Sequence, residues 1–345
     1  MTTDDPAGLL YLTRADVRQL CAGLDVVAAV ARTLVLHAEG RTTLPEEAYL
    51  PWHTTDGHFA RSLALPGAVW SDRPAIGLKV INSSLANPGR GLPRAQGLTL
   101  LFDRERAHPV AIMEAAHISA LRTAAYTVLS ARTLAVAQPR RIGVVGAGAL
   151  GEQHVELLAG EYPGAAFVLF DHVAERAEAV AARLTLGGLA VSAVGSAEAA
   201  VRDSEIVVTT TTTTTGYIPH EWLSPGALLA HVSLDDVLPD VVRRADLLIV
   251  DDWDLIKADD RRLLGRMYRS GDLVGADDPV PAEPSAPRRV DASLGDVLAG
   301  RHPGRRKQDE IVLSNPFGMG VLDVAVAGEV YALACDSGVG LRLPV

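Results

Sequence analysis

Three glycines at a fixed spacing are the residues whose chemistry is easiest to interpret in this chain. Gly146, Gly148 and Gly151 follow a short apolar run and precede apolar residues at helical spacing. In a turn from strand to helix, the first glycine permits the sharp bend, the second lets backbone approach a pyrophosphate, and the third lets helix and strand pack closely. The helix start, with Ala149 and Leu150, offers unpaired N–H groups to phosphates. The spacing predicts a dinucleotide site, and a purely structural turn is the alternative.

An acidic residue at the end of the next apolar run supports the dinucleotide interpretation. Asp171 follows the run Ala166–Phe170 and lies twenty residues after Gly151. At that place a carboxylate accepts hydrogen bonds from the adenosine ribose and repels a 2′-phosphate. Asp171 therefore favours NAD over NADP, although Arg176 places a positive charge nearby.

Hydroxyl side chains follow two later strands of the same pattern. Thr209–Thr215 is a run of seven threonines, and Ser233 ends the next apolar segment. Ligands of parallel sheets bind at the carboxyl ends of the strands, so Thr209, Thr210 and Ser233 are candidate cofactor contacts. The alternative for the run is the ordinary preference of threonine for strands.

Two cations stand in apolar or alanine-rich surroundings. Lys79 lies in the segment GLKVI, where a partly desolvated ammonium could move protons or hold a carboxylate. Arg122 and Thr123 lie near the start of the predicted helix Ser119–Ala135 and have donors suited to a phosphate or a carboxylate. The alternatives are a surface lysine, a solvated arginine and a helix cap.

Other kinds of site have no support in the sequence. The ten histidines show no HxH or HExxH spacing, and the cysteines, Cys21 and Cys335, lie far apart outside any CxxC pattern. We therefore expect neither a metal centre nor a disulfide framework. The nucleophile elbow GxSxG is absent from the sequence as well.

Length, composition and charge limit the class of protein. A chain of 345 residues suggests two domains, and 48% hydrophobic with 21% charged residues is ordinary for a globular protein. A net charge of −10 argues against binding nucleic acid or anionic lipid. The N-terminal MTTDDPAG lacks a cationic segment, and no apolar run is long enough for a membrane span. We expect a cytoplasmic protein.

The order of the elements predicts an α/β protein of two domains. Residues 126–319 alternate strands and helices, which indicates a Rossmann domain with a doubly wound parallel sheet. Residues 1–125 have two helical patterns and then short segments divided by Gly, Pro and Asp, which indicates an α+β domain. We expect residues 320–345, with a last helix from Val321 onward, to return to that first domain.

Three motifs in a fixed order carry a resemblance to a known family. GLKVINSSLANPGRGLPRAQGLTLLFD, then SALRTAAYTVLSARTLA and then RIGVVGAGALG resemble the ornithine cyclodeaminase/μ-crystallin family across residues 10–340. The resemblance implies that Lys79 and Arg122 hold the substrate beside the nicotinamide and that Thr123 meets the phosphates of NAD. It also implies a homodimer through the first domain, which would bind substrate and dimerise.

Two departures from the cyclodeaminase pattern argue against cyclisation of ornithine. The aspartate expected after the fourth Rossmann strand is replaced by the threonine run, with no acidic residue before Glu221. An arginine expected ahead of the lysine strand is replaced by Glu46 and Glu47. The segments LLAHVSLDDVLPDVV, LIVDDWDLI and IVLSNPFGMGVLDVAVAGEVY instead resemble the branch that makes 2,3-diaminopropionate for siderophores and peptide antibiotics.

That branch implies an N-(2-amino-2-carboxyethyl)-L-glutamate dehydrogenase. NAD would take a hydride from the glutamate Cα, and water would hydrolyse the imine to 2-oxoglutarate and L-2,3-diaminopropionate. Lys79 would deprotonate the amine or activate water, and Arg122 would bind a carboxylate. The alternatives are an ornithine or lysine cyclodeaminase, a ketimine reductase, an alanine dehydrogenase, or a non-catalytic dinucleotide-binding protein of the crystallin type.

Overall fold

The computed structural model describes residues 8–279 and 286–344. The first seven residues of the N-terminal segment MTTDDPAG, used above to argue against export, lie outside this range. The chain forms two compact units, which we call unit 1, Met1–Arg122 with Met319–Val345, and unit 2, Thr123–Gly318. One boundary falls inside helix α3, Ala116–Leu134.

Unit 1 is built on a mixed sheet with the strand order β18-β1-β7-β6-β5-β4-β2, in which β3 also pairs with β4. All neighbouring pairs are antiparallel except β1 with β7. The strands are β1 Leu9–Leu12, β2 Thr42–Thr43, β3 Ala48–His53, β4 Phe59–Val69, β5 Ala75–Ser84, β6 Ala95–Phe102, β7 Pro109–Glu114 and β18 Leu341–Leu343. The 3-10 turn η1, Pro88–Arg90, lies between β5 and β6.

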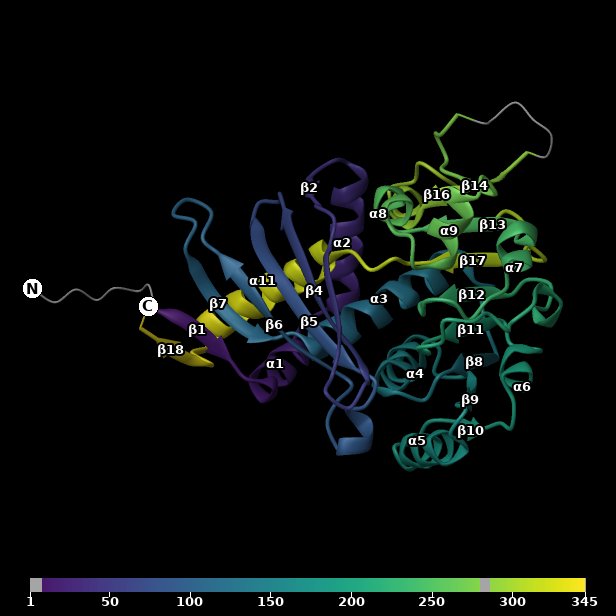
Figure 1. The fold of residues 1–345 in the computed structure, drawn as a ribbon, viewed down its shortest axis with the longest axis horizontal. Helices are drawn as coiled ribbons and strands as arrows, with labels where there is room; N and C mark the ends of the chain where they lie inside the picture. Colours follow the sequence, from purple (N-terminus) through teal and green to yellow (C-terminus); the bar gives the residue numbers. More distant parts are fainter. Residues whose placement is uncertain (1–7, 280–285, 345) are drawn as a thin grey trace, which may run out of the picture. The chain divides into compact units, whose positions relative to one another are not determined.

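One face of this sheet is covered by helix α11, Gly320–Ser337, which packs on β4, β5 and β6 (Figure 1). A strand glycine allows the helix to approach, because a Cβ on Gly67 would lie 2.7 Å from a Val321 methyl. Gly77 on β5 also faces the helix, near Val324, but a Cβ there would be excluded by the Leu100 carbonyl oxygen of β6 at 2.5 Å. The shorter helices α1, Arg14–Cys21, and α2, Val26–Ala38, pack against α11. Residues far apart in sequence thus share one core.

Unit 2 contains a parallel sheet with the order β10-β9-β8-β11-β12-β17-β13-β16. The strands are β8 Arg141–Val145, β9 Ala166–Phe170, β10 Val191–Ala193, β11 Ile206–Thr209, β12 Leu228–His231, β13 Leu247–Val250, β16 Ala292–Ser293 and β17 Val312–Asn315, and a separate pair joins β14 Leu273–Val274 to β15 Arg288–Arg289. The helices are α4 Ala149–Glu161, α5 Ala174–Leu186, α6 Ala197–Val201, α7 Pro239–Arg244, α8 Trp253–Ala258, α9 Leu263–Arg269 and α10 Leu294–Leu298, with the 3-10 turn η2 His220–Trp222. The predicted Rossmann domain and the α/β class are confirmed.

The central strands of unit 2 are buried along their whole length. Every residue of β11, β12 and β13 is buried, as are four of the five residues of β8. A parallel sheet covered on both faces has continuous apolar strands, because neither side of the strand faces water. These unbroken runs are what made the strands recognisable in the sequence.

In the described ranges, no single helix is long and apolar enough to cross a membrane. Helices α1 and α2 reach that length and composition only when taken together, and they are bent by 86° from each other.

Candidate functional site

The glycine turn of unit 2 has a different structural requirement at each of its three glycines. Gly146 has φ +110°, and a Cβ there would lie 2.8 Å from Thr210 Oγ1. A Cβ on Gly151 would lie 1.9 Å from the carbonyl oxygen of Gly146, so α4 and the turn pack too closely for any side chain. A Cβ on Gly148 would meet no atom within 4 Å. The middle glycine therefore faces open space, which a ligand could enter.

The N-terminus of α4 begins at this open position. Gly148 is the N-cap residue, and no side chain caps the helix there. Gly148 and Ala149 are exposed, and Leu150 is half-buried. The first-turn N–H groups have no intrahelical partners, and the helix dipole favours a negative charge at this end. The turn thus fits the pyrophosphate of a dinucleotide.

Asp171 is buried and fixed against the glycine turn. Its carboxylate accepts hydrogen bonds from the N–H groups of Ala147 at 2.9 Å and Val173 at 3.0 Å. Arg176 Nη1 lies 3.4 Å from the same carboxylate. The structure thus brings Asp171 and the three glycines together, as a dinucleotide site requires.

The first threonines of the run are bonded within unit 2. Thr210 Oγ1 donates to the carbonyl oxygen of Gly146 at 2.9 Å, which ties the end of β11 to the glycine turn. Ser233 Oγ lies 2.6 Å from Thr209 Oγ1 and also donates to Asp236, and both hydroxyl residues are buried. Thr209 and Ser233 are brought together, and their hydroxyls have structural partners.

A buried carboxylate in the loop after β12, Asp236, was missed by the sequence analysis. Asp236 accepts hydrogen bonds from Thr211 Oγ1 and from the Tyr217 hydroxyl, each at 2.8 Å. Burial raises the pKa of Asp236, and the bonds from Ser233, Tyr217 and Thr211 oppose that shift. An acidic side chain therefore does lie beside the threonine run, supplied by the loop after the next strand. The lack of an acidic residue after the fourth strand in chain order thus speaks less strongly against cyclisation, because Asp236 lies near that position in space.

His231 at the end of β12 is neutral. Its Nε2 accepts a hydrogen bond from the Asp236 N–H at 3.2 Å. Burial, with a smaller effect of the Arg262 charge, lowers the pKa of His231 to about 3. Asn315, at the end of β17, contacts the same ring at 2.8 Å, so this imidazole holds two strand ends together.

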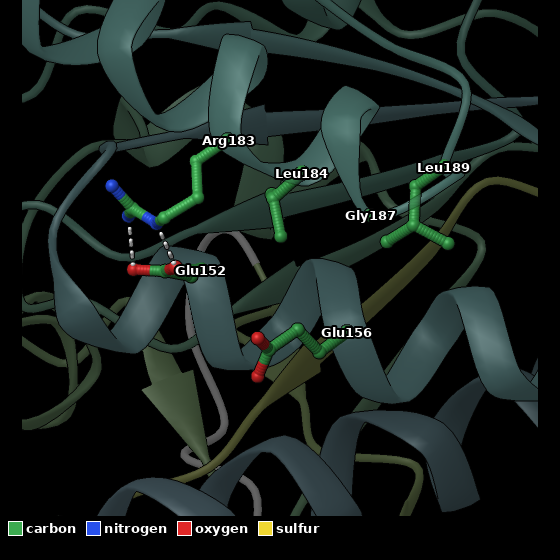
Figure 2. A pocket seen from close by; sticks show the side chains of 6 residues that line it. All are labelled: Glu152, Glu156, Arg183, Leu184, Gly187 and Leu189. Carbon is green, nitrogen blue, oxygen red and sulfur yellow. Dashed lines mark hydrogen bonds and ion pairs between the residues drawn. The ribbon is translucent and has the colours of Figure 1, made fainter.

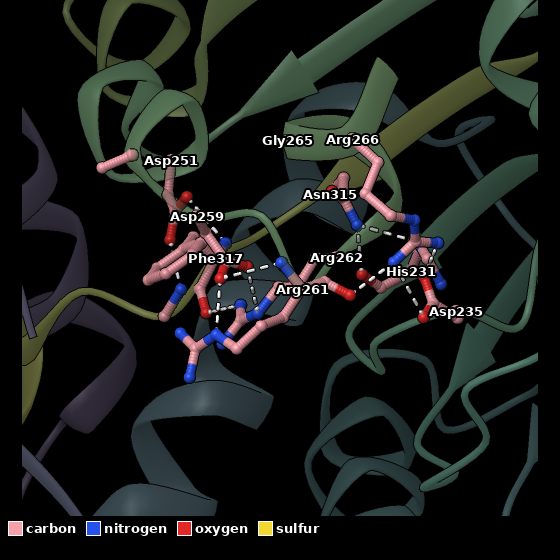
Figure 3. Close-up of polar contacts among 12 residues, drawn as sticks. His231, Asp235, Asp251, Asp259, Arg261, Arg262, Gly265, Arg266, Asn315 and Phe317 are labelled. Carbon is pink, nitrogen blue, oxygen red and sulfur yellow. Dashed lines mark hydrogen bonds and ion pairs between the residues drawn. The ribbon is translucent and has the colours of Figure 1, made fainter. Parts of the chain in front are cut away.

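The chain segment after β17 is anchored by charged side chains of unit 2, as Figure 3 shows. Asp251, at the end of β13, accepts hydrogen bonds from the N–H groups of Phe317 at 2.8 Å and Gly318 at 2.7 Å. The Arg262 guanidinium lies 3.9 Å from the centre of the Phe317 ring and donates to its carbonyl oxygen. This anchor is where the backbone leaves unit 2.

Unit 1 contains a buried cluster of one carboxylate and two cations, which we call the cation cluster. Lys79 Nζ lies 2.6 Å from Asp323 Oδ2 and 3.2 Å from Ser119 Oγ. Arg122 Nε lies 3.2 Å from the same Asp323 oxygen. Lys79 is 2% exposed and Asp323 is fully buried. The structure thus brings the two predicted cations together through a residue that was not predicted.

The surroundings of Lys79 bring the pKa of its ammonium closer to neutral pH than that of an ordinary lysine. Burial lowers its pKa to about 8, and the positive charge of Arg122 acts in the same direction. The negative charges of Asp323 and Glu47 raise its pKa and oppose the effect of burial. A lysine with this pKa can exchange a proton near physiological pH.

The cation cluster is positioned by three elements. Lys79 and Gly77 are buried on the face of β5 that meets α11, because alternate residues of a strand share a face. Thr99 pairs with Lys79 across the sheet, and its buried hydroxyl has no partner in the described structure. Asp323 Oδ1 likewise has none. Unpaired buried polar atoms are costly, so a ligand or water belongs here.

Asp323 had a signal that the sequence analysis did not use. It is the single charged residue in the otherwise apolar segment 320–328 of α11. A buried charge requires a partner, and cations on other elements are the usual ones. Thr123 adjoins Arg122 in α3, is half-buried and belongs to unit 2.

A surface pocket of about 310 Å³ lies on α4 and α5 of unit 2 (Figure 2). It is lined by Glu152, Glu156, Arg183, Leu184, Gly187 and Leu189. Arg183 is paired with Glu152 at 2.7 Å, so the cation in the pocket is neutralised. Over residues 8–279 and 286–344, no group of three or more His, Cys, Asp or Glu side chains is placed to hold a metal ion.

Comparison with known proteins identifies a family whose sequence pattern matches most of this chain. The model of the ornithine cyclodeaminase/mu-crystallin family matches residues 9–338. A relative from Staphylococcus aureus, N-((2S)-2-amino-2-carboxyethyl)-L-glutamate dehydrogenase, is 30% identical over 342 residues, which cover 97% of this chain and 98% of the relative.

Solved structures show the same architecture. The crystal structure of CmnK is 43% identical and superposes with a TM-score of 0.90, covering 98% of this chain and 99% of CmnK. An archaeal alanine dehydrogenase dimer with bound NAD is 25% identical with a TM-score of 0.81, covering 97% of this chain and 98% of that one. The matches span both units of the fold.

Proposed function

The chain belongs to the ornithine cyclodeaminase/mu-crystallin family, and on that premise we propose that it oxidatively cleaves N-(2-amino-2-carboxyethyl)-L-glutamate, with NAD, to L-2,3-diaminopropionate and 2-oxoglutarate. The main support for this substrate is the full-length similarity to the Staphylococcus aureus N-((2S)-2-amino-2-carboxyethyl)-L-glutamate dehydrogenase. The buried cation cluster supports an anionic amino-acid substrate, because its single carboxylate is shared by two cations.

The chain is an NAD-dependent dehydrogenase of amino acids, as its relatives are. Within unit 2, we assign NAD to the glycine turn, with Gly146, Gly148 and Gly151 shaping the backbone and the start of α4 meeting the phosphates. Asp171 would accept hydrogen bonds from the adenosine ribose. Thr123, Thr209, Thr210 and Ser233 complete the proposed cofactor set.

The proposed reaction consumes one water for each conjugate oxidised. NAD, when bound, accepts the hydride that leaves the glutamate Cα, while the secondary amine loses its proton. The resulting C=N bond adds water and breaks, so that the glutamate carbons leave as 2-oxoglutarate and the nitrogen stays on 2,3-diaminopropionate. The sum is conjugate, NAD⁺ and water giving both products, NADH and one proton.

Lys79 is the proposed proton acceptor in unit 1. Its pKa of about 8 leaves a fraction of the side chain neutral near physiological pH, so it can take the amine proton. Arg122 would bind a substrate carboxylate, because a guanidinium offers several donors in a planar arrangement that matches a carboxylate. Asp323 holds both cations in place without meeting the reaction itself.

The deciding experiment is product analysis of the purified protein. Incubation with NAD and the conjugate should give 2-oxoglutarate and 2,3-diaminopropionate in equal amounts by mass spectrometry, together with one NADH for each. Incubation with L-ornithine, L-alanine and L-proline under the same conditions tests the other activities of the family. Proline formed from ornithine without diaminopropionate from the conjugate would refute the proposed substrate, and bound NAD without turnover of any of them would favour a non-catalytic protein.

We also propose a homodimer formed through the open face of the unit 1 sheet, the one opposite α11. Residues paired across neighbouring strands share a face, which places Leu50, Leu98 and Trp52 together there. Their exposed fractions are 64%, 41% and 42%. The same apolar surface is extended by four half-buried side chains, those of Leu78, Val80, Leu100 and Ile112. An apolar face of this kind is typical of a subunit interface.

The dimer can be tested by light scattering after size exclusion. A Leu50→Asp, Leu98→Glu double variant should run as a monomer, because two charges would have to be buried in the interface. Leu186→Glu is the control, since Leu186 is 90% exposed on α5 of unit 2. A double variant that remains a dimer would place the interface elsewhere.

The proposed setting is the biosynthesis of a siderophore or a peptide antibiotic that contains 2,3-diaminopropionate. A cytoplasmic location suits a protein whose cysteines, Cys21 and Cys335, are both free.

A further inference from the structure

Two arginines flank one end of β5 in unit 1. Arg61 on β4 pairs with Ser83, and Ala95, the first residue of β6, pairs with Ser83 from the other side. The carbonyl oxygen of Arg94 accepts the Ser84 N–H at 3.0 Å, so Arg94 adjoins the same end. Strands lie about 4.8 Å apart, which puts the two arginine backbones about 10 Å from each other. Arg94 lies just ahead of β6, outside the alternation of that strand, and the positive charge of Arg61 acts on its guanidinium.

Neither arginine has an acidic partner. Arg61 Nε donates to Ser83 Oγ at 3.3 Å, and among the described residues no carboxylate forms an ion pair with Arg61 or Arg94. Both side chains are half-buried. The chain has ten more acidic than basic residues, so carboxylates are plentiful. Two arginines that form no ion pair with a carboxylate therefore need another explanation.

The two guanidiniums repel each other. Burial lowers the pKa of Arg94, and the positive charge of Arg61 lowers it further. Arg305 in unit 2 is an example of a buried arginine with a structural role. Burial lowers the pKa of Arg305 as well, but its guanidinium donates to the carbonyl oxygens of Leu134 at 2.5 Å and Gly226 at 2.9 Å. In the described structure, the Arg94 guanidinium has no such acceptors, so a bound anion would relieve the repulsion.

Arg61 lies on the same face of the sheet as Lys79. Lys79 and Ser83 are four residues apart on β5, which is an even spacing, and Arg61 pairs with Ser83. Lys79 and Ser83 are about 13 Å apart along the strand. A substrate can span this distance when long side chains reach toward it from both ends. This face of β5 therefore carries positive charge both at the cation cluster and at its Ser83 end.

We propose that Arg61 and Arg94 bind a second carboxylate of the substrate, one remote from the reacting carbon. This inference rests on the proposed function, because the glutamate conjugate carries three carboxylates, and Arg122 is assigned only one of them. The arginine pair would restrict the enzyme to amino acids with more than one carboxylate. Alanine, proline and ornithine, with one carboxylate each, would leave the pair unfilled.

The kinetic test replaces the arginines one at a time. Arg61→Gln and Arg94→Gln should each raise KM for the conjugate roughly 10- to 100-fold, the loss expected for a hydrogen bond to a charged group. The change in kcat should be smaller, since the reacting carbon keeps Lys79 and Arg122. Arg73→Gln is the matched control, because Arg73 is exposed in the same β4–β5 hairpin and loses the same charge. Arg94→Lys should recover part of the loss.

A binding test separates this proposal from the proposed function. Calorimetry of the NAD-loaded enzyme should show glutarate, with two carboxylates, binding at least tenfold more tightly than butyrate, with one. That preference should disappear in Arg61→Gln and Arg94→Gln and persist in Arg73→Gln. If wild-type protein fails to oxidise the conjugate, the proposed function is wrong, yet the glutarate preference still tests the arginines.

Equal affinity for glutarate and butyrate in the wild type would overturn the arginine proposal, as would a preference that survives both glutamine variants. Circular dichroism and NAD affinity establish that each variant is folded. Should Arg94→Gln fail to fold, Arg61→Gln decides alone, because Arg61 lies within a strand and its change leaves the backbone pairing intact.

Discussion

The glycine turn of unit 2 and the cation cluster of unit 1 are built in opposite ways. The turn works through backbone: Gly146 and Gly151 are required by close packing, and Gly148 leaves an open space beside the first turn of α4. The cluster works through side chains, with Lys79, Arg122 and Asp323 supplied by β5, α3 and α11. The first site is continuous in sequence, and the second exists only after folding.

This difference separates the two tasks of a dehydrogenase. A backbone cradle recognises phosphates, which are common to every dinucleotide, and tolerates change in the rest of the domain. A buried charge cluster depends on each of its members, because removing one leaves the others uncompensated. We expect substitutions in the turn to affect cofactor affinity and substitutions in the cluster to affect the chemical step.

The largest effect should come from Lys79→Met. If the lysine accepts the amine proton, kcat/KM for the conjugate should fall by about 10²- to 10⁴-fold, the usual contribution of a positioned base. NAD affinity should remain that of the wild type, because the glycine turn is untouched. Lys307→Met, on an exposed lysine, is the control. Activity within tenfold of the wild type would remove Lys79 from the chemistry.

The second prediction compares two glycines of the turn. Gly148→Val should weaken NAD binding roughly 100-fold, about 2.7 kcal/mol, while the melting temperature of the NAD-free protein changes little, because the added side chain enters open space. Gly151→Ala should instead lower the melting temperature, since its Cβ would lie 1.9 Å from the Gly146 carbonyl oxygen. Calorimetric titration and thermal unfolding measure the two effects. The opposite assignment would mean that Gly148 is structural.

A smaller effect is expected at Asp171. Asp171→Asn removes the charge while its side-chain oxygen can still accept the Ala147 N–H, so the preference for NAD over NADP, as a ratio of kcat/KM values, should fall about tenfold. Asp203→Asn is the control, because Asp203 is exposed in unit 2 and its positive φ suits asparagine. An unchanged ratio would show that the carboxylate does not set the cofactor preference.

The smallest effect is a shift of the pH profile by Asp323→Asn. With Lys79 as the base, kcat/KM of the wild type should rise with pH through a midpoint near 8, as the lysine loses its proton. Asp323 raises that pKa, while Arg122 lowers it and Glu47 raises it. Neutralising Asp323 should therefore move the midpoint to lower pH by about one unit. Displacement of the midpoint to higher pH would contradict this arrangement of charges.

Much of the fold could be predicted because its signals are local. The apolar runs of β8, β9 and β11 and the glycine spacing each lie within a few residues, and the predicted Rossmann sheet formed from them. The order of the strands was not predictable in the same way. β17 lies between β12 and β13 although it follows both in the chain, and no local pattern records that insertion.

The candidate site was predictable where one residue stands out from its neighbours. Lys79 in an apolar strand is such a residue, and so is the acidic Asp171 after β9. Asp323 and Asp236 were missed because their importance lies in contacts with residues distant in sequence, Lys79 for the first and Thr211 for the second. Such contacts follow from strand pairing and helix packing, which a sequence read in order does not contain.

The division of unit 1 between two stretches of chain has a consequence for synthesis on the ribosome. The sheet of unit 2 is complete once Asn315 has been made, whereas α11 and its Asp323 come afterwards. During translation, unit 2 can therefore reach its native form before Asp323 is available to form ion pairs with Lys79 and Arg122. The nascent protein would acquire its nucleotide cradle first and its reactive lysine environment only as translation approaches residue 337.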